Sequence, residues 1–329
     1  MRAPEFWNAE ASGRDRADML RVLLTPVSAL YAWAAARRWR TATPHRAPVP
    51  VVCVGNFTVG GAGKTPITRA VRAALGPGAH TLSRGYGGRL RGPVLVDAGM
   101  SASDAGDEPL VHAVDGPAWI ARDRVAGALA AAEAGARAIV MDDGFQNPGL
   151  AKDVNIVAVD PAFRIGNGRV FPAGPLRERL ADGLARADAI VMLHPAEADR
   201  APAPDWLSGF DKPVLHATLA PSAPPPSGKL IAFAGLARPE KFFAALRSAG
   251  AELEDAIPFA DHHAYAPSDL ELLSRIASER GARLITTEKD AARLAPDWRA
   301  RVAVLPVTAR FDDADALHAL LVPIRARMS

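Results

Sequence analysis

The sequence predicts an α/β protein with a mainly parallel sheet flanked by helices, followed by a second, smaller α/β unit. Short apolar runs of strand length recur along the chain, and stretches that read as helices separate them. A proline-rich stretch interrupts this alternation, which then resumes beyond it. With 329 residues, 49% of them apolar and 23% charged, the chain is long enough for two globular units.

The elements follow from these runs in chain order. In the first unit we expect strands at Val49–Val54, Val94–Val96, Ala138–Met141, Ile156–Val159 and Ala189–Leu193. In the second unit we expect strands at Leu230–Ala234, Glu254–Phe259, Arg283–Thr287 and Val302–Pro306, with helices at Pro239–Ser248 and Pro267–Glu279. The predicted division is a helical segment at 1–40, the larger unit at 41–216, a proline-rich linker at 217–229 and the smaller unit at 230–329.

Composition excludes several classes of protein. The formal charge is only +3 and the basic residues are scattered, so no nucleic-acid-binding stripe is expected. The single cysteine, Cys53, allows no internal disulfide, indicates a reducing compartment and reads as a small apolar filler of its strand. Acidic residues at Glu5, Glu10 and Asp15 precede the first apolar stretch, which argues against a secretory signal.

The first apolar stretch has the spacing of an amphipathic helix. Fifteen mostly apolar residues lie between Arg21 and Arg37, fewer than the roughly 20 that span a bilayer. Leu20, Leu23, Leu24, Val27, Leu30, Tyr31 and Ala34 share one helical face, and Arg21, Thr25 and Ser28 lie opposite. Arg37, Arg38 and Arg40, interleaved with Trp33 and Trp39, suit an anionic membrane surface. A helix packed on its own domain would have the same spacing.

A glycine-rich loop predicts binding of a nucleoside triphosphate. It reads Thr58, Val59, Gly60, Gly61, Ala62, Gly63, Lys64, Thr65, and it stands between a predicted strand and a helix at Ile67–Leu75. Glycines let backbone N–H groups converge on phosphate oxygens, a lysine reaches the terminal phosphates, and a hydroxyl ligates Mg²⁺. The generic pattern has glycine where this chain has Thr58, so a glycine-rich turn with a chance lysine is the competing interpretation. The larger unit is therefore predicted to have the fold of P-loop nucleoside triphosphatases.

Acidic residues stand at two further places where chemistry is expected. Asp142 and Asp143 follow a predicted strand, where carboxylates commonly hold the Mg²⁺ of phosphate-loop enzymes, although an Asp-Asp-Gly turn needs no such role. Asp107 and Glu108 open a predicted helix, where acids are favoured by the helix dipole. A carboxylate in such a loop could also orient a hydroxyl nucleophile and accept its proton.

Three other loops carry candidate functional groups. Asp261-His262-His263 in the second unit could bind a metal or tune a base, or the histidines could simply lie on the surface. Arg84 and Arg177 lie in loops rich in glycine or proline, where arginines often grip phosphate and where solvated charges are also common.

Taken together, these strings resemble the tetraacyldisaccharide 4'-kinase family, the lipid A 4'-kinases of Gram-negative bacteria. The resemblance covers nearly the whole chain: the amino-terminal helix, Gly55–Pro66, Leu82–Gly88, Gly106–Pro109, Asp142–Gln146, Pro172–Glu178, Asp261–His263 and Thr287–Asp290. The family's loop also begins with a hydroxyl residue at the position of Thr58. The family usually has histidine after Asp-Asp-Gly-Phe-Gln, whereas this chain has Asn147, which cannot titrate.

The resemblance implies an activity and roles for individual residues. ATP would donate its γ-phosphoryl group to the 4'-hydroxyl of a tetraacylated glucosamine disaccharide 1-phosphate, at the cytoplasmic face of the inner membrane, with no obligate protein partner. Lys64 and the loop amides would hold the phosphates, and Thr65 with Asp142 or Asp143 would place Mg²⁺. Asp107 would be the base, paired across a closing cleft with His262 in preference to His263. The rim of the active site would include Glu108, Arg124 and Arg177.

Two other functions are compatible with a phosphate loop. A switch or assembly ATPase would use hydrolysis for a conformational change and would need no surface for acyl chains. A soluble small-molecule kinase would keep its activity toward a short-chain acceptor without residues 1–40. Acyl-chain preference, oligomeric state and the extent of closure do not follow from the sequence.

Overall fold

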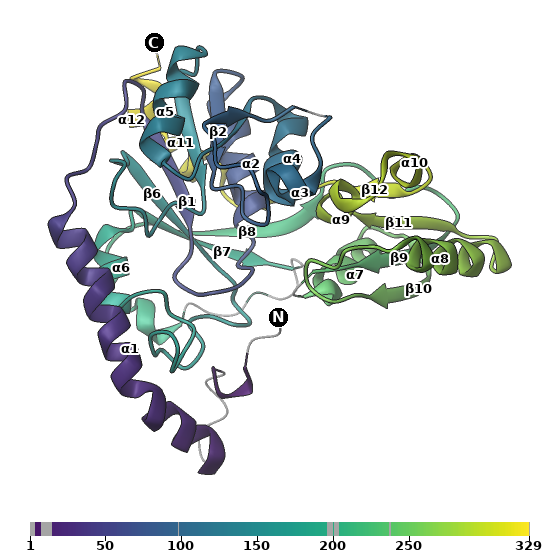
Figure 1. Cartoon of the computed structure of the whole chain (residues 1–329), viewed down its shortest axis with the longest axis horizontal. Helices are drawn as coiled ribbons and strands as arrows, with labels where there is room; N and C mark the ends of the chain where they lie inside the picture. Colours follow the sequence, from purple (N-terminus) through teal and green to yellow (C-terminus); the bar gives the residue numbers. More distant parts are fainter. Residues whose placement is uncertain are drawn as a thin grey trace.

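The computed structural model describes residues 4–7, 15–97, 99–195, 200, 204–236 and 238–328. Parts of the predicted segment 1–40, including Glu10, lie outside these residues. Within them the chain forms two sheets: nine strands in the order β13-β8-β7-β6-β1-β5-β2-β4-β3, and four in the order β10-β9-β11-β12. Figure 1 shows the two sheets side by side, each with its own helices.

The larger sheet is mainly parallel, as predicted. Only its edge pairings, β3 with β4 and β13 with β8, are antiparallel. Its strands are β1 (Val51–Gly55), β2 (Ala79–Ser83), β3 (Val94–Leu95), β4 (Ala118–Ile120), β5 (Ala138–Asp142), β6 (Val154–Val159), β7 (Ala189–His194), β8 (Val214–Pro221) and β13 (Val307–Phe311). The sequence did not single out β2, β4, β8 or β13.

Helices cover both faces of the larger sheet. One face carries a core to which α2 and the C-terminal helices contribute, and the other carries a core that includes α5 and the loops after β5 and before α6. The helices are α1 (Asp15–Thr41), α2 (Lys64–Leu75), α3 (Ala102–Ala105), α4 (Asp107–Asp115), α5 (Arg124–Glu133), α6 (Leu180–Arg186), α11 (Ala314–Leu320) and α12 (Val322–Arg325), with short 3-10 turns at Glu5–Trp7 and Asp205–Leu207.

The central strand β1 is the point from which the site is built. Its five residues are buried, as expected for a strand covered on both faces. Among them, Cys53 is fully buried, and burial raises the pKa of its thiol to about 11, so the thiol stays protonated. β1 pairs in parallel with β5 on one side and β6 on the other, which brings the carboxyl ends of all three strands to one edge of the sheet.

The smaller sheet is entirely parallel and closely matches the predicted elements. It consists of β9 (Lys229–Ala234), β10 (Glu252–Pro258), β11 (Arg283–Thr287) and β12 (Ala303–Leu305), with α7 (Pro239–Ser248), α8 (Pro267–Glu279), α9 (Glu288–Arg293) and α10 (Pro296–Arg299). Its own core lies on both faces of the sheet. The short helix α9, which the sequence did not predict, packs against α4 of the larger body.

The predicted domain boundaries differ from the structure. The first part of the predicted linker is the end of β8, because Ala217 is buried in the sheet and the prolines start only at its last residue. After β12 the chain returns to the larger body, where β13 pairs with β8 from Val307 opposite Pro221 to Phe311 opposite Ala217. Leu317, Leu321 and Ile324 then complete a core of that body. The smaller body is thus an insertion between β8 and β13, and 230–329 is not one unit.

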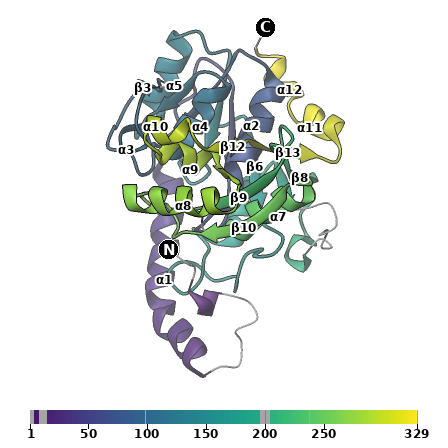
Figure 2. The ribbon, with the colours of Figure 1, turned by 90° about the vertical axis from the view of Figure 1, so that its right-hand side faces the viewer.

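The amino-terminal helix extends well beyond the apolar stretch between Arg21 and Arg37. Its polar residues Arg21 and Ser28 are buried while most of its large apolar residues are exposed, which reverses the pattern of an ordinary surface helix. It runs without interruption through Pro26 for 27 residues. The Arg21 Nε donates to the carbonyl of Phe6, in the 3-10 turn before the helix, at 2.9 Å, and the Ser28 hydroxyl accepts from the Ala173 N–H of the larger body at 2.9 Å. Figures 1 and 2 show the helix as a long rod beside the larger body, with its N-terminal part extending beyond the sheet.

The apolar face of α1 is exposed. Leu23 is 68% exposed, Leu30 63% and Val27 53%, and Met19, Leu20, Val22, Tyr31 and Trp33 are exposed as well. The stretch Arg16–Thr41 is long and apolar enough to cross a membrane by length and composition, so the expectation that it falls short of a span was wrong. An apolar face of this size on the outside of a helix is typical of a membrane or partner contact.

Candidate functional site

The glycine-rich loop connects the central strand to a helix, as the sequence predicted. β1 ends at Gly55 and α2 begins at Lys64, with residues 56–63 between them. Gly63 caps α2 with φ 75°, and a Cβ there would lie 2.2 Å from Cδ2 of Leu193. Only glycine fits that turn. The loop therefore places backbone N–H groups at the N-terminus of α2, where anions are favoured.

A buried asparagine, Asn56, is hydrogen-bonded to the backbone of the glycine-rich loop. The Nδ2 of Asn56 donates to the carbonyls of Thr58 at 2.7 Å and Gly60 at 3.2 Å. Its Oδ1 accepts from Lys64 Nζ at 3.4 Å. Asn56 is fully buried, so these bonds hold the loop in one conformation. The sequence analysis had given Asn56 no role of its own.

Two carboxylates stand next to the loop, at the end of β5. Asp142 pairs with Val54 across the sheet, and the N–H of Asp143 donates to the Val54 carbonyl at 3.0 Å. Asp143 has φ 56°, a conformation that residues other than glycine adopt rarely and that concentrates at functional sites. Its Oδ1 lies 2.7 Å from Nη1 of Arg177 and 3.7 Å from Lys64 Nζ. Burial raises the pKa of Asp143, but these two cations outweigh burial and hold the pKa below its usual range.

The second carboxylate is held by a histidine that sequence reasoning missed. Asp142 Oδ2 lies 2.7 Å from Nε2 of His112 on α4, and both side chains are 1% exposed. The other oxygen, Oδ1, is buried without a hydrogen-bond partner among the described residues. An anionic oxygen in that situation suits a cation.

These residues fit a Mg²⁺ site of the kind that phosphate-loop enzymes use. The described residues contain no cluster of three or more His, Cys, Asp or Glu that could hold a metal alone. Mg²⁺ usually keeps several waters and binds one or two carboxylates plus substrate phosphates, so such a cluster is not required. Thr65, in the first turn of α2, has the hydroxyl that this type of site uses.

Asp107 lies at the first position of α4, where two bodies of the protein meet. Gly106 precedes it with φ 86°, and a Cβ there would lie 2.5 Å from the Tyr86 carbonyl oxygen. The N–H of Glu108 donates to Asp107 Oδ1 at 3.0 Å. The side chain is only 6% exposed, although the helix start is near the surface of the larger body. A simple dipole role does not require that burial or the contacts that Asp107 makes with the smaller body.

The smaller body supplies basic partners to Asp107 and to its neighbour Glu108. His262 Nδ1 lies 3.3 Å from Asp107 Oδ2, and Arg293 Nη2 donates to the same oxygen. Lys289 Nζ lies 2.6 Å from Glu108 Oε1. Burial raises the pKa of Asp107, but the hydrogen bond from His262 and the charges of Arg293 and Lys289 hold the pKa well below its usual range. The hydrogen bond to Asp107 raises the pKa of His262 despite partial burial.

His262, with φ 57°, shares the rare left-handed conformation of Asp143. His263 points elsewhere: its Nε2 lies 2.9 Å from Asp269 Oδ2, and its ring packs against Phe259. The geometry therefore brings His262, and not His263, to Asp107.

The predicted arginines differ in their surroundings. Arg177 lies in the site, since its Nε donates to the Thr58 carbonyl at 3.1 Å and its Nη1 contacts Asp143. Arg124 is buried, donates to the Ala121 carbonyl at 2.6 Å and interacts electrostatically with Asp142 and Asp143, so its place at the rim stays a prediction. Arg84 is exposed. The Oδ1 of Asn147 accepts from the N–H groups of Gly149 at 3.0 Å and Leu150 at 3.2 Å, which is a local turn role.

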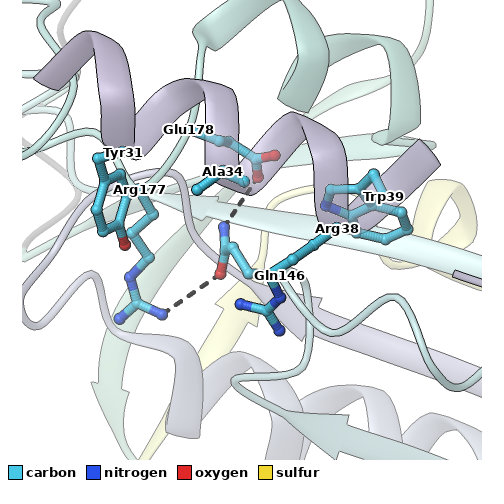
Figure 3. Close-up of a pocket in the computed structure, with 8 residues that line it drawn as sticks. Tyr31, Ala34, Arg38, Trp39, Gln146, Arg177 and Glu178 are labelled. Carbon is cyan, nitrogen blue, oxygen red and sulfur yellow. Dashed lines mark hydrogen bonds between the residues drawn. The ribbon is translucent and has the colours of Figure 1, made fainter. Parts of the chain in front are cut away.

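A small pocket of about 130 Å³ lies between α1 and the loop that carries Arg177. Figure 3 shows Gln146 at its base, donating to Glu178 Oε1 at 3.1 Å and accepting from Arg177 Nη1 at 3.4 Å. The lining residues are Tyr31, Ala34, Ala35, Arg38, Trp39, Gln146, Arg177 and Glu178. The pocket combines aromatic surface with arginines and shares Arg177 with the acid pair.

The fold and the site define a phosphate-loop nucleotide-binding protein, with an acid pair beside the loop and a second body docked on α4. Its relatives specify the class further. The family model described as tetraacyldisaccharide-1-P 4'-kinase matches residues 20–325. The chain belongs to the tetraacyldisaccharide 4'-kinase family.

Individual relatives agree with this membership. The chain is 49% identical to a tetraacyldisaccharide 4'-kinase of Hyphomonas neptunium over 99% of each chain. It is 52% identical to one of Phenylobacterium zucineum, over 97% of this chain and 98% of the relative. Among solved structures it resembles the LpxK of Aquifex aeolicus in complex with ATP, with a TM-score of 0.75, 27% identity and coverage of 93% of this chain and 99% of the other.

The contact between Asp107 and His262 predicts a pH dependence of stability. Because the folded-state pKa of His262 is raised, the contact is fully favourable below its unfolded pKa of about 6.5 and is lost as pH rises through the folded value. Because the pKa of Asp107 is lowered, its contribution is present above about pH 4 and is lost at more acidic pH. The loss of thermal stability in His262→Gln should therefore be largest near pH 5 to 6 and smaller near pH 9, as measured by thermal unfolding.

The matched control is His262→Gln in an Asp107→Asn background. There the destabilisation by His262→Gln should no longer depend on pH in this way. A destabilisation of the same size at acidic and alkaline pH in the otherwise wild-type chain would contradict the assigned contact.

Proposed function

We propose that this chain is an ATP-dependent kinase that phosphorylates the 4'-hydroxyl of a tetraacylated glucosamine disaccharide 1-phosphate in lipid A biosynthesis. Membership in the tetraacyldisaccharide 4'-kinase family establishes it as a kinase of this class. One structural observation carries the assignment of the chemistry: the glycine-rich loop, the acid pair and Asp107 belong to one body, and the other body contacts Asp107. A switch ATPase has no need of an exposed apolar helix.

The phosphate-binding roles follow from the loop and its neighbours. The N–H groups of residues 58–65 and the ammonium of Lys64 would hold the triphosphate at the N-terminus of α2. Asp143 pairs with two cations, Lys64 and Arg177, so positive charge remains beside the glycine-rich loop after Asp143 is neutralised. Thr65, Asp142 and Asp143 would hold Mg²⁺, which would supply positive charge to neutralise the phosphates.

Asp107 would orient the sugar hydroxyl and accept its proton. Its low pKa makes it a weak base, yet phosphoryl transfer has a loose transition state in which the nucleophile loses its proton late. Orientation therefore matters more than basicity. His262 would support the carboxylate from the second body, so the base is complete only when the two bodies are docked.

We place the enzyme on the cytoplasmic face of the inner membrane, where ATP is available, with α1 lying in the interface. The Ser28 hydroxyl ties α1 to Ala173 of the larger body, and Arg21 ties it to Phe6 in the turn before the helix, so one side of α1 is fixed against the protein. The exposed leucines and Trp33 would enter the acyl region, and the arginines near the end of α1 would meet anionic headgroups. The pocket between α1 and Arg177 lies where a headgroup held at that surface could reach the site.

Asp107→Asn should lower turnover with little effect on nucleotide binding. Loss of a positioned proton acceptor is expected to lower kcat by about 10²- to 10⁴-fold. The measurement is transfer of label from γ-labelled ATP to the lipid disaccharide in detergent micelles, with ATP affinity measured by calorimetry. Equal losses in kcat and ATP affinity would assign Asp107 to nucleotide binding or folding. ATP hydrolysis by the wild type without labelled lipid would support the switch ATPase.

Leu23→Gln with Leu30→Gln should weaken membrane binding. Each leucine is more than 60% exposed, and its transfer to an apolar phase is worth about 1.5 to 3 kcal/mol, so the double variant should partition into anionic vesicles at least about tenfold less. Co-sedimentation with phosphatidylglycerol vesicles measures this. Leu272→Gln with Val322→Gln, which removes exposed apolar residues of other helices, is the matched control and should bind as the wild type does. Equal binding by both double variants would argue against insertion of α1.

A further inference from the structure

Arg293 is the residue of the smaller body that contacts both members of the proposed catalytic pair. It is the last residue of α9, and its side chain is 9% exposed. One nitrogen, Nη2, donates to Asp107 Oδ2 and lies 3.2 Å from His262 Nδ1. The other, Nη1, donates to Asp290 Oδ1 and to the Gly235 carbonyl, each at 3.0 Å. The guanidinium therefore bridges the two bodies with separate nitrogens.

The anchor of Arg293 is rigid. Asp290 is fully buried, and its carboxylate accepts from the Gly235 N–H at 3.0 Å, the Tyr265 hydroxyl at 2.8 Å and the Thr287 hydroxyl at 2.6 Å. Both oxygens of the Asp290 carboxylate are thus hydrogen-bonded. The fixed carboxylate in turn orients the guanidinium of Arg293 that bonds to it. Because the His262 N–H also donates to the Gly235 carbonyl at 3.1 Å, Arg293 and His262 share one backbone support.

Asp107 and Arg293 together can hold the His262 ring in either protonation state. When Nδ1 carries a proton, it can donate to Asp107 at 3.3 Å. When Nδ1 is unprotonated, it can accept from Arg293 Nη2 at 3.2 Å instead. In both cases the Asp107 carboxylate keeps the Arg293 bond, so its orientation does not depend on the histidine alone.

We propose that Arg293 is a positioning residue that aligns Asp107 and His262 when α9 docks on α4. This inference rests on the proposed function, because it assigns a residue that acts through the proposed base. Arg293 does not contact the nucleotide loop in this arrangement, so it acts on turnover and leaves nucleotide binding unchanged. Lysine at this position can contact one of the two carboxylates but cannot bridge Asp107 and Asp290 with a rigid fork.

The test is a double-mutant cycle with Asp107→Asn, read as label transfer from ATP to the lipid disaccharide. Arg293→Gln should lower kcat at least about tenfold, a loss of transition-state alignment, with the KM for lipid and the affinity for ATP within about twofold of wild type. Arg293→Lys should be intermediate. In the Asp107→Asn background, Arg293→Gln should change kcat by less than about twofold, because its partner is already lost.

The control is Arg299→Gln, which removes a nearby arginine whose side chain donates, within the described part of the chain, to the backbone carbonyls of Ala291, Ala292 and Leu294. It should lower thermal stability and leave kcat near wild type. If Arg293→Gln does not fold, the cycle is run with Arg293→Lys, which keeps the positive charge. A wild-type kcat in Arg293→Lys and Arg293→Gln, or equal fold losses in both backgrounds, would overturn the inference. Absence of label transfer by the wild type would instead refute the proposed function.

Discussion

The charged contact between α4 and α9 determines how the two bodies of this protein work together. Asp107 meets Arg293, and Glu108 meets Lys289, at the start of α4. Arg69 of α2 reaches Glu288 at 2.6 Å and Asp115, at the far end of α4, at 2.6 Å. These partly buried pairs compensate one another's desolvation only while the bodies are docked. The same interface therefore closes the molecule and completes the proposed base.

The arrangement has a simple origin in the topology. The chain leaves the larger sheet after β8, builds the smaller sheet and returns as β13, which pairs with β8. Both ends of the insertion are fixed to adjacent strands, so the smaller body is held near the carboxyl edge of the larger sheet, where parallel α/β proteins bind ligands. The glycine-rich loop and the acid pair lie at that edge because β1 and β5 are neighbours. On the side of the larger body away from the smaller one (Figure 1), α1 exposes leucines while Ser28 bonds to Ala173 and Arg21 bonds to Phe6 in the turn before the helix, a pattern expected where the surroundings are apolar.

Those parts of the fold and the site that depend on neighbouring residues in the chain could be predicted from the sequence. Buried strands are apolar runs, and the loop from Thr58 to Thr65 has a fixed spacing, so β1, β5 and the start of α2 were predicted closely. The helices at Pro239–Ser248 and Pro267–Glu279 begin at prolines and were predicted to the residue. Long-range partners have no such signal. His112 bonding Asp142, Arg293 bonding Asp107 and the return of β13 to β8 all join residues from different elements, and α9 is too short to show a helical period. The amphipathic spacing expected for α1 describes only part of the helix, since Met19, Val22 and Trp33 outside the predicted face are exposed as well, and which side meets the protein depends on where Ala173 and Phe6 lie.

Docking of the two bodies through Asp107 is tested most directly by measuring the distance between the bodies in solution. Spin labels at Glu133→Cys, at the end of α5, and Glu279→Cys, at the end of α8, report it by pulsed electron resonance, and the native Cys53 is buried and should remain unlabelled. We expect one narrow distance distribution in the otherwise wild-type chain and a broader one with added longer distances when Asp107 is replaced by alanine. An unchanged narrow distribution in that variant would contradict docking through the Asp107 carboxylate.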